Sequence, residues 1–121
     1  MTDYKIKVTT TGSAGSATGS ATSFRPVTGL LTGVKIDYHA SAPATTDVTI
    51  TESSGMARTL LTRTSSATDG VFYPSAQQHD TAASTVTSYT PFDIKGDYVT
   101  VTIAECDALT DAVVVTLHTL E

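Results

Sequence analysis

The seven residues from Tyr98 to Ala104, with the sequence YVTVTIA, decide the fold class of this chain. Val99, Val101 and Ile103 fall on one side of this stretch, and threonines fill the positions between them. Strict alternation of apolar and polar residues is typical of a β-strand with one buried face. Valine, isoleucine and threonine are branched at Cβ, which favours extended backbone over helix. The stretch therefore predicts a strand whose apolar side chains face a core.

The same period-two pattern recurs along the chain, whereas no long stretch shows an apolar stripe with helical spacing. The expected strands cover residues 3–11, 34–39, 47–52, 57–64, 85–89, 98–104 and 112–120. Short strands separated by regular turns favour an all-β, single-domain antiparallel β-sandwich, jelly-roll-like or Ig-like. The last strand is apolar on both faces, which indicates either a central strand or a face covered by another subunit.

The composition supports the same fold class. The chain has 121 residues, enough for one domain with one modest core. It contains 25 Thr and 12 Ser, so these two types make up 37 of the 121 residues. Only 16% of the residues are charged, against roughly 25% in typical soluble domains. Such a chain is expected to present many threonine-faced strands.

The N-terminal part differs from the rest in its side chains. Residues 12–23 are all Gly, Ser, Ala or Thr, a composition typical of a flexible linker. We therefore expect an extended N-terminal arm and linker over residues 1–23, followed by a β-sandwich body over residues 24–121. An extended arm can add a strand to an exposed sheet edge of a partner. The residues expected to dock in this way are Tyr4, Lys5, Ile6, Lys7 and Val8.

Charge and hydropathy exclude several classes of function. The net charge of −5 argues against a nucleic-acid-binding domain, which needs clustered Lys and Arg. Residues 1–60 carry a net charge of +1 and residues 61–121 a net charge of −6. This asymmetry is expected if one face docks on a partner and the other is solvated, but it also arises without any functional cause. No apolar run approaches the roughly 20 residues needed to span a bilayer, and no signal peptide is visible. The single cysteine, Cys106, suits a protein made in a reducing cytoplasm.

Residues that could hold a metal ion are scattered along the sequence. A zinc site needs three or four converging ligands, and the three histidines come from three separate segments. Nine of the twelve acidic residues are Asp, but none forms the calcium-binding loop of an EF-hand. The candidate metal ligands are His39, His79 and His118 for zinc and Asp93, Asp97, Asp107 and Asp111 for calcium. We expect no metal and no cofactor.

Catalytic patterns are equally weak. The chain has no G-x-S-x-G motif. His79 and Asp80 are adjacent, but a catalytic triad also needs a serine beside the imidazole, and no sequence pattern places one there. Cys106 lies between two acidic residues, which disfavour its thiolate form. We therefore expect no catalytic residue. Aromatic residues that could instead form a sugar-stacking platform are Tyr38, Phe72, Tyr73, Tyr89, Phe92 and Tyr98.

Three segments carry a resemblance to a known class of protein. They are PATTDVTI at residues 43–50, DGVFYP at residues 69–74 and DAVVVT at residues 111–116. In this order, and in a chain of this length, they resemble small β-rich virion proteins of tailed bacteriophages, which often act as capsid decoration (cement) proteins. The resemblance covers about residues 24–120 as a pattern. It implies a non-enzymatic structural protein repeated many times on the capsid surface of a virion.

We therefore expect a protein that decorates and stabilises the outer capsid surface by binding the major capsid protein. We also expect it to associate with itself, with a trimer as the first expectation, and to bind neither nucleic acid nor membrane. Another phage structural role, in a tail, baseplate or head fibre, is the nearest alternative. A small carbohydrate-binding module is the alternative from a different class.

Overall fold

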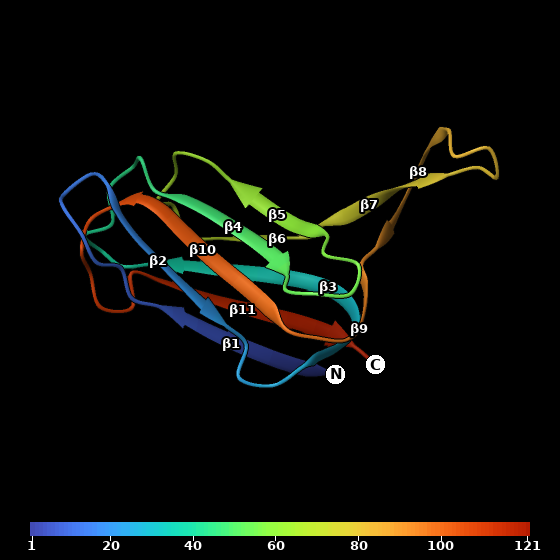
Figure 1. Ribbon diagram of the computed structural model, residues 1–121, viewed down its shortest axis with the longest axis horizontal. Helices are drawn as coiled ribbons and strands as arrows, with labels where there is room; N and C mark the ends of the chain where they lie inside the picture. Colours follow the sequence, from blue (N-terminus) through green and yellow to red (C-terminus); the bar gives the residue numbers. More distant parts are fainter.

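The computed structural model describes all residues from Met1 to Glu121 and contains eleven β-strands. It contains no helix, and so none that could cross a membrane. The strands are β1 (Thr2–Val8), β2 (Ala17–Thr22), β3 (Val27–Tyr38), β4 (Asp47–Glu52), β5 (Thr59–Arg63), β6 (Gly70–Phe72), β7 (Ser75–His79), β8 (Thr85–Pro91), β9 (Asp93–Asp97), β10 (Val99–Cys106) and β11 (Val113–Leu120). Two sheets face each other and a hairpin projects from one end (Figure 1). The prediction of a single-domain antiparallel β-sandwich is confirmed.

Each sheet is antiparallel, and the strand order mixes distant parts of the sequence. The first sheet has the order β1-β11-β3-β6, with β9 also paired to β3, and the second has the order β2-β10-β4-β5. Strand β11 lies between β1 and β3, so the prediction of a central strand from its two apolar faces is confirmed. Its inward residues are fully buried, and most residues of its outer face are half-buried between the side chains of the strands on either side.

The core lies between the two sheets and is built by alternate residues of each strand. Val99, Val101 and Ile103 of β10 are fully buried, as the alternation with threonine predicts. In the opposite sheet, every second residue of β11 from Val113 to Leu117 is also fully buried. One continuous cluster of 21 buried residues results. The inward-facing rows of two packed sheets form such a core because side chains alternate between the faces of a strand.

The predicted N-terminal arm is wrong. Residues 2–8 form β1, which pairs along its whole length with β11. Tyr4, Ile6 and Val8 are buried in the core, with exposed fractions of 4%, 2% and 0%. The alternation that predicted a strand is present because this strand buries one face in its own domain, not in a partner. The first sandwich residue is therefore near the start of the chain and not at residue 24.

The predicted flexible linker is also wrong, since residues 17–22 form β2, an edge strand paired with β10. Small side chains are needed here because the chain passes very close to the end of β1. A Cβ atom at Gly19 would lie 2.4 Å from the carbonyl oxygen of Thr9. Thr11 and Thr18 also exchange two backbone hydrogen bonds, of 2.9 and 3.0 Å. The glycine at position 19 thus reflects the close approach of two backbones and not flexibility.

The projecting hairpin is an insertion into an edge strand. Strand β6 pairs with residues 34–36 of β3, and β9 pairs with residues 27–30 of the same strand, in the same direction. The two are successive halves of one edge position, and the chain between them leaves the sheet to form the β7–β8 hairpin (Figure 1). Residues 75–84, which lie outside the strands expected from the sequence, contain β7 and the hairpin turn.

Candidate interaction surfaces and polar cleft

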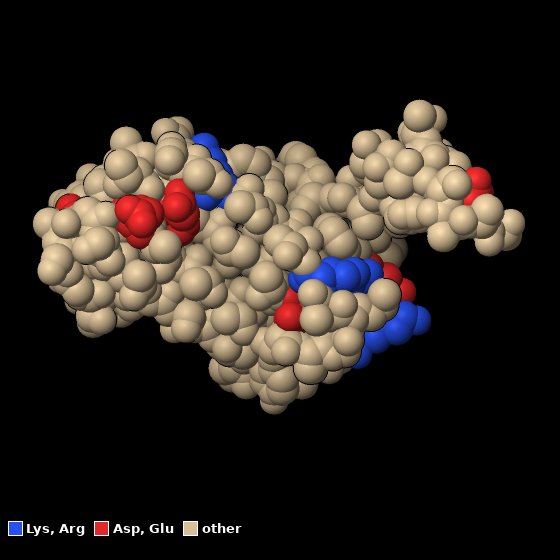
Figure 2. All heavy atoms as spheres, turned by 45° about the horizontal axis from the view of Figure 1, so that its top comes forward, with Lys and Arg blue, Asp and Glu red and all other residues tan.

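The β7–β8 hairpin, residues 75–91, is named the arm from here on, and it is distinct from the N-terminal arm that the sequence predicted. None of its residues is buried, and only Ala76 and Val86 are even half-buried. In Figure 2 it forms a lobe that stands away from the body and is almost entirely free of charged side chains. Its sequence contains one acidic residue, Asp80, and neither Lys nor Arg. Both faces of the arm are therefore available to a partner that offers uncharged, hydrogen-bonding surface.

The arm has an ordered tip. A carboxylate oxygen of Asp80 accepts hydrogen bonds from the backbone N–H groups of Ala82 and Ser84, at 2.9 and 3.0 Å. The side-chain amide of Gln77 donates to the carbonyl of Val86 across the hairpin at 2.9 Å. Asp commonly closes turns by bonding backbone groups that follow it. Local bonds thus hold the tip and the middle of the arm in the hairpin conformation, while Ala76 at its base packs against the core.

Strand β1 is the outer strand of its sheet. Of the five residues predicted to dock, the structure places three side chains inside the domain and leaves Lys5 and Lys7 exposed. Asp3, on the same outer face, is hydrogen-bonded to Nδ1 of His118 on β11. The exposed features of β1 are therefore its two lysines and its unpaired edge. Their role in docking stays a prediction.

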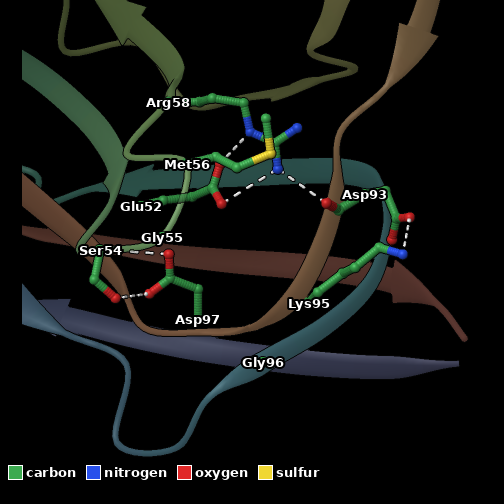
Figure 3. A pocket seen from close by; sticks show the side chains of 9 residues that line it. All are labelled: Glu52, Ser54, Gly55, Met56, Arg58, Asp93, Lys95, Gly96 and Asp97. Carbon is green, nitrogen blue, oxygen red and sulfur yellow. Dashed lines mark hydrogen bonds and ion pairs between the residues drawn. The ribbon is translucent and has the colours of Figure 1, made fainter.

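A polar cleft of about 370 Å³ lies where the β4–β5 turn meets β9 (Figure 3). At its base, the Arg58 guanidinium donates to both carboxylate oxygens of Glu52, at 2.5 and 3.2 Å, and to the carbonyl oxygen of Asp93 at 2.9 Å. The Glu52 side chain is only 3% exposed and that of Arg58 is 24% exposed. The ring of Phe92 lies beneath the guanidinium, and the distance from Cζ of Arg58 to the ring centroid is 5.2 Å.

The second buried acid of the cleft, Asp97, also has hydrogen-bond donors within the protein. Asp97 accepts a hydrogen bond from the Ser54 hydroxyl at 2.9 Å and a longer one from the Ser54 N–H at 3.4 Å. Gly55 adopts a φ of +57°, and a Cβ there would lie 3.2 Å from the Asp97 carboxylate. Both buried carboxylates are thus held by donors of the β4–β5 turn, as Figure 3 shows. We name this set of contacts the clasp, because it ties the β4–β5 turn to β9.

A second, shallower groove of about 320 Å³ runs over the outer face of the first sheet. Tyr73, which is 76% exposed, lines it together with the Asp3–His118 pair and Lys35. An exposed aromatic ring flanked by charged groups is a surface on which a polar ligand can stack. Tyr73 is one of the aromatic candidates in the sequence, and the fold brings Asp3, Lys35 and His118 beside it.

The metal and nucleophile candidates do not converge. No three or more His, Cys, Asp or Glu side chains lie close enough together to hold a metal ion. His118 contacts Asp3, whereas His39 accepts a hydrogen bond from the N–H of Ser41 at 3.0 Å. Cys106 is completely buried within the hydrophobic core.

Tyr38 is the one titratable group with a distinctly perturbed pKa. Burial raises the pKa of its hydroxyl above the usual value of 10.0, and the nearby Arg63 guanidinium only partly opposes the rise. The hydroxyl oxygen is buried, and although Arg63 and Ser66 lie beside it, neither side chain is in hydrogen-bonding geometry with it. An unpaired buried hydroxyl costs free energy because it has lost its bonds to water.

We predict that Tyr38→Phe leaves the free energy of unfolding unchanged at neutral pH or raises it by up to about 1 kcal/mol. In the wild type, stability should hold below pH 10.0, the ordinary pKa, and fall as the pH rises toward the raised folded value. The reason is that the unfolded chain releases this proton more readily than the folded chain. Urea denaturation at pH 7 and above pH 10 would measure both effects. A clear loss of stability at pH 7 would contradict the prediction.

No known protein family matches this sequence, and no curated protein matches it either.

Proposed function

We propose that this protein is a structural subunit of a tailed-phage particle that binds the outer surface of the capsid and stabilises it. The arm is the observation that carries the proposal. It projects from a well-packed body, exposes both faces and carries almost no charge. A two-stranded hairpin alone in water is marginally stable, so a partner surface that covers it contributes to its order.

The body suits the same role. Its sandwich has a continuous core, and the clasp holds Asp93 at the start of β9, the strand into which the arm returns. A rigid body with a projecting β-hairpin can join neighbours by main-chain hydrogen bonds. Many such contacts, each weak, add up when they are repeated around a symmetric shell. The resemblance to capsid decoration proteins supplies the class of partner, the major capsid protein.

Binding to emptied phage heads tests this proposal. Purified protein mixed with undecorated heads should bind saturably, in many copies per particle, and should raise the temperature at which the heads disrupt. Shortening the arm by replacing residues 77–89 with Gly-Asn-Gly should lower the occupancy by more than about tenfold, because multivalent binding amplifies each lost contact. The matched control, Lys95→Ala, changes an exposed lysine of β9, outside the arm, and should bind as the wild type does.

Electron microscopy of the labelled protein on particles would separate this role from its nearest alternative. Density spread over the capsid supports decoration. Density confined to a tail, a baseplate or a single fibre contradicts it and favours another structural role. Failure to bind any part of the particle overturns both.

The groove beside Tyr73 favours a second candidate function, a small carbohydrate-binding module. The exposed ring and the flanking Asp3, Lys35 and His118 provide a stacking surface and hydrogen-bonding groups. Binding on a glycan array that is lost in Tyr73→Ala, or in Tyr89→Ala on the arm, would support this function. The absence of any bound glycan would remove it.

A further inference from the structure

The arm and β1 lie at opposite edges of the same sheet. The arm interrupts the edge formed by β6 and β9, whereas β1 forms the other edge, beyond β11 and β3 (Figure 1). Within this sheet, each copy of the chain therefore has a projecting strand pair on one side and the open edge of β1 on the other. Such an arrangement is suited to a head-to-tail contact between copies.

The open edge of β1 has backbone groups without a partner in the chain. Residues 2–8 make their backbone–backbone hydrogen bonds only within the ladder to β11. All 15 of the other backbone–backbone bonds involve residues outside β1. In an antiparallel edge strand, the N–H and C=O groups of alternate residues point away from the sheet. They form a template to which another strand can pair.

Strand β8 has the properties of the strand that would pair there. Its sequence, TVTSYTP, is rich in residues with high β-propensity and has no charged residue. It pairs only with β7, so its other edge is also open. Natural proteins usually protect such an edge with lysines, bulges or a covering element. Strand β8 carries no lysine and no element covers its outer edge, although its ladder with β7 shifts register between Gln77 and His79.

The charges of the two edges are compatible. Strand β1 exposes Lys5 and Lys7, while its one acid, Asp3, is occupied by His118. The arm carries a single negative charge, Asp80, at its tip. Attraction between unlike charges orients the encounter of the arm with β1. Pairing of two β1 edges is disfavoured because it would bring lysines of both copies together.

We infer that β8 of one copy adds to the open edge of β1 of a second copy, so that copies join head to tail through one extended sheet. This inference deepens the proposed function, since it rests on the arm being the adhesive element and names a second copy as its partner. A head-to-tail contact closes into a ring when its rotation permits. A cyclic oligomer of this kind would present the capsid-binding surface in several copies at once.

Cross-linking between two single-cysteine variants tests the contact. Lys5→Cys and Thr87→Cys both replace exposed side chains, and the native Cys106 is completely buried. A short bifunctional thiol reagent should give covalent dimers when the two variants are mixed. Each variant alone should remain uncross-linked, as should the wild type. This asymmetry is expected because the contact joins two different edges.

Two results would overturn the inference. Efficient cross-linking of Thr87→Cys with itself would show that arms pair with arms. Absence of cross-linking in the mixture, with a monomer in sedimentation at every concentration tested, would show that the copies do not associate.

Shortening the arm gives an independent measurement on the purified protein alone. Replacing residues 77–89 with Gly-Asn-Gly keeps Ala76 and Phe92, the arm-side residues that contact the core. Self-association measured by sedimentation should weaken by more than about tenfold, because several main-chain hydrogen bonds are lost together. Unchanged association would contradict the inference. Oligomers that fail to bind heads would leave the inference standing and overturn the proposed capsid role, while monomers that still decorate heads would do the reverse.

Discussion

Deletion of residues 1–8 is expected to unfold the protein. Strand β1 provides an entire edge ladder to β11 and places Tyr4, Ile6 and Val8 in the core. Removing one large buried side chain typically costs about 2–5 kcal/mol. Losing three of them costs about 6–15 kcal/mol, as much as the whole stability of roughly 5–15 kcal/mol of a typical domain, and the lost β1–β11 ladder adds to that cost. Far-UV circular dichroism and a thermal melt would show loss of the cooperative transition.

A single substitution measures the same contribution without removing the strand. Ile6→Ala should lower the free energy of unfolding by about 2–4 kcal/mol, because it leaves a cavity between the sheets. Lys5→Ala changes the neighbouring exposed residue and should stay within about 0.5 kcal/mol of the wild type. A truncated protein that still melts cooperatively at the wild-type temperature would show that β1 is dispensable, as a peripheral docking arm would be.

The strands that sequence patterns predicted correctly are those with one buried face. Residues 47–52 were predicted as a strand and form β4 with the same bounds. Residues 98–104 correspond to β10, which extends two residues further to Cys106. In both strands, the core selects apolar residues at every second position while solvent permits threonine at the others. The period-two pattern is the direct record of that burial.

The strands that sequence patterns missed lack this asymmetry. The arm is exposed on both faces, so nothing selects apolar residues at alternate positions of β7. In β2, the restriction is a close approach of two backbones at Gly19, which favours small residues and mimics the composition of a linker. The error about residues 1–23 followed from that mimicry: a segment that looked flexible separated β1 from the strands with which it packs.

The clasp was not predictable for a different reason. Glu52 and Arg58 are six residues apart and are brought together by the β4–β5 turn, but their common partner on β9 is distant in the sequence. A single sequence does not show which charged residues meet across elements. A weak signal was available nonetheless, since Glu52 ends β4 at a position where the alternation predicts a buried side chain.

Arg58→Ala is the second substitution for which we expect a large effect, a loss of about 3 kcal/mol in the free energy of unfolding. The substitution leaves the carboxylate of Glu52, whose side chain is 3% exposed, without its bidentate partner. It also removes the bond to the carbonyl of Asp93 and the guanidinium that covers Phe92. Breaking a buried pair from one side is costly because the remaining charge cannot be solvated. Urea denaturation at pH 7 would measure the loss.

Two matched variants identify the buried charge as the cause. Adding Glu52→Gln to Arg58→Ala removes the charge and should recover about 1–2 kcal/mol, although it restores no contact with β9. Lys95→Ala breaks the ion pair between Lys95 and Asp93, whose side chains are 83% and 51% exposed, respectively. This substitution should cost less than about 0.5 kcal/mol in the free energy of unfolding. If the double variant were as unstable as Arg58→Ala alone, the loss would come from the contacts to Asp93 and Phe92 and not from Glu52. The clasp would then act on β9, and hence on the base of the arm, chiefly through the arginine.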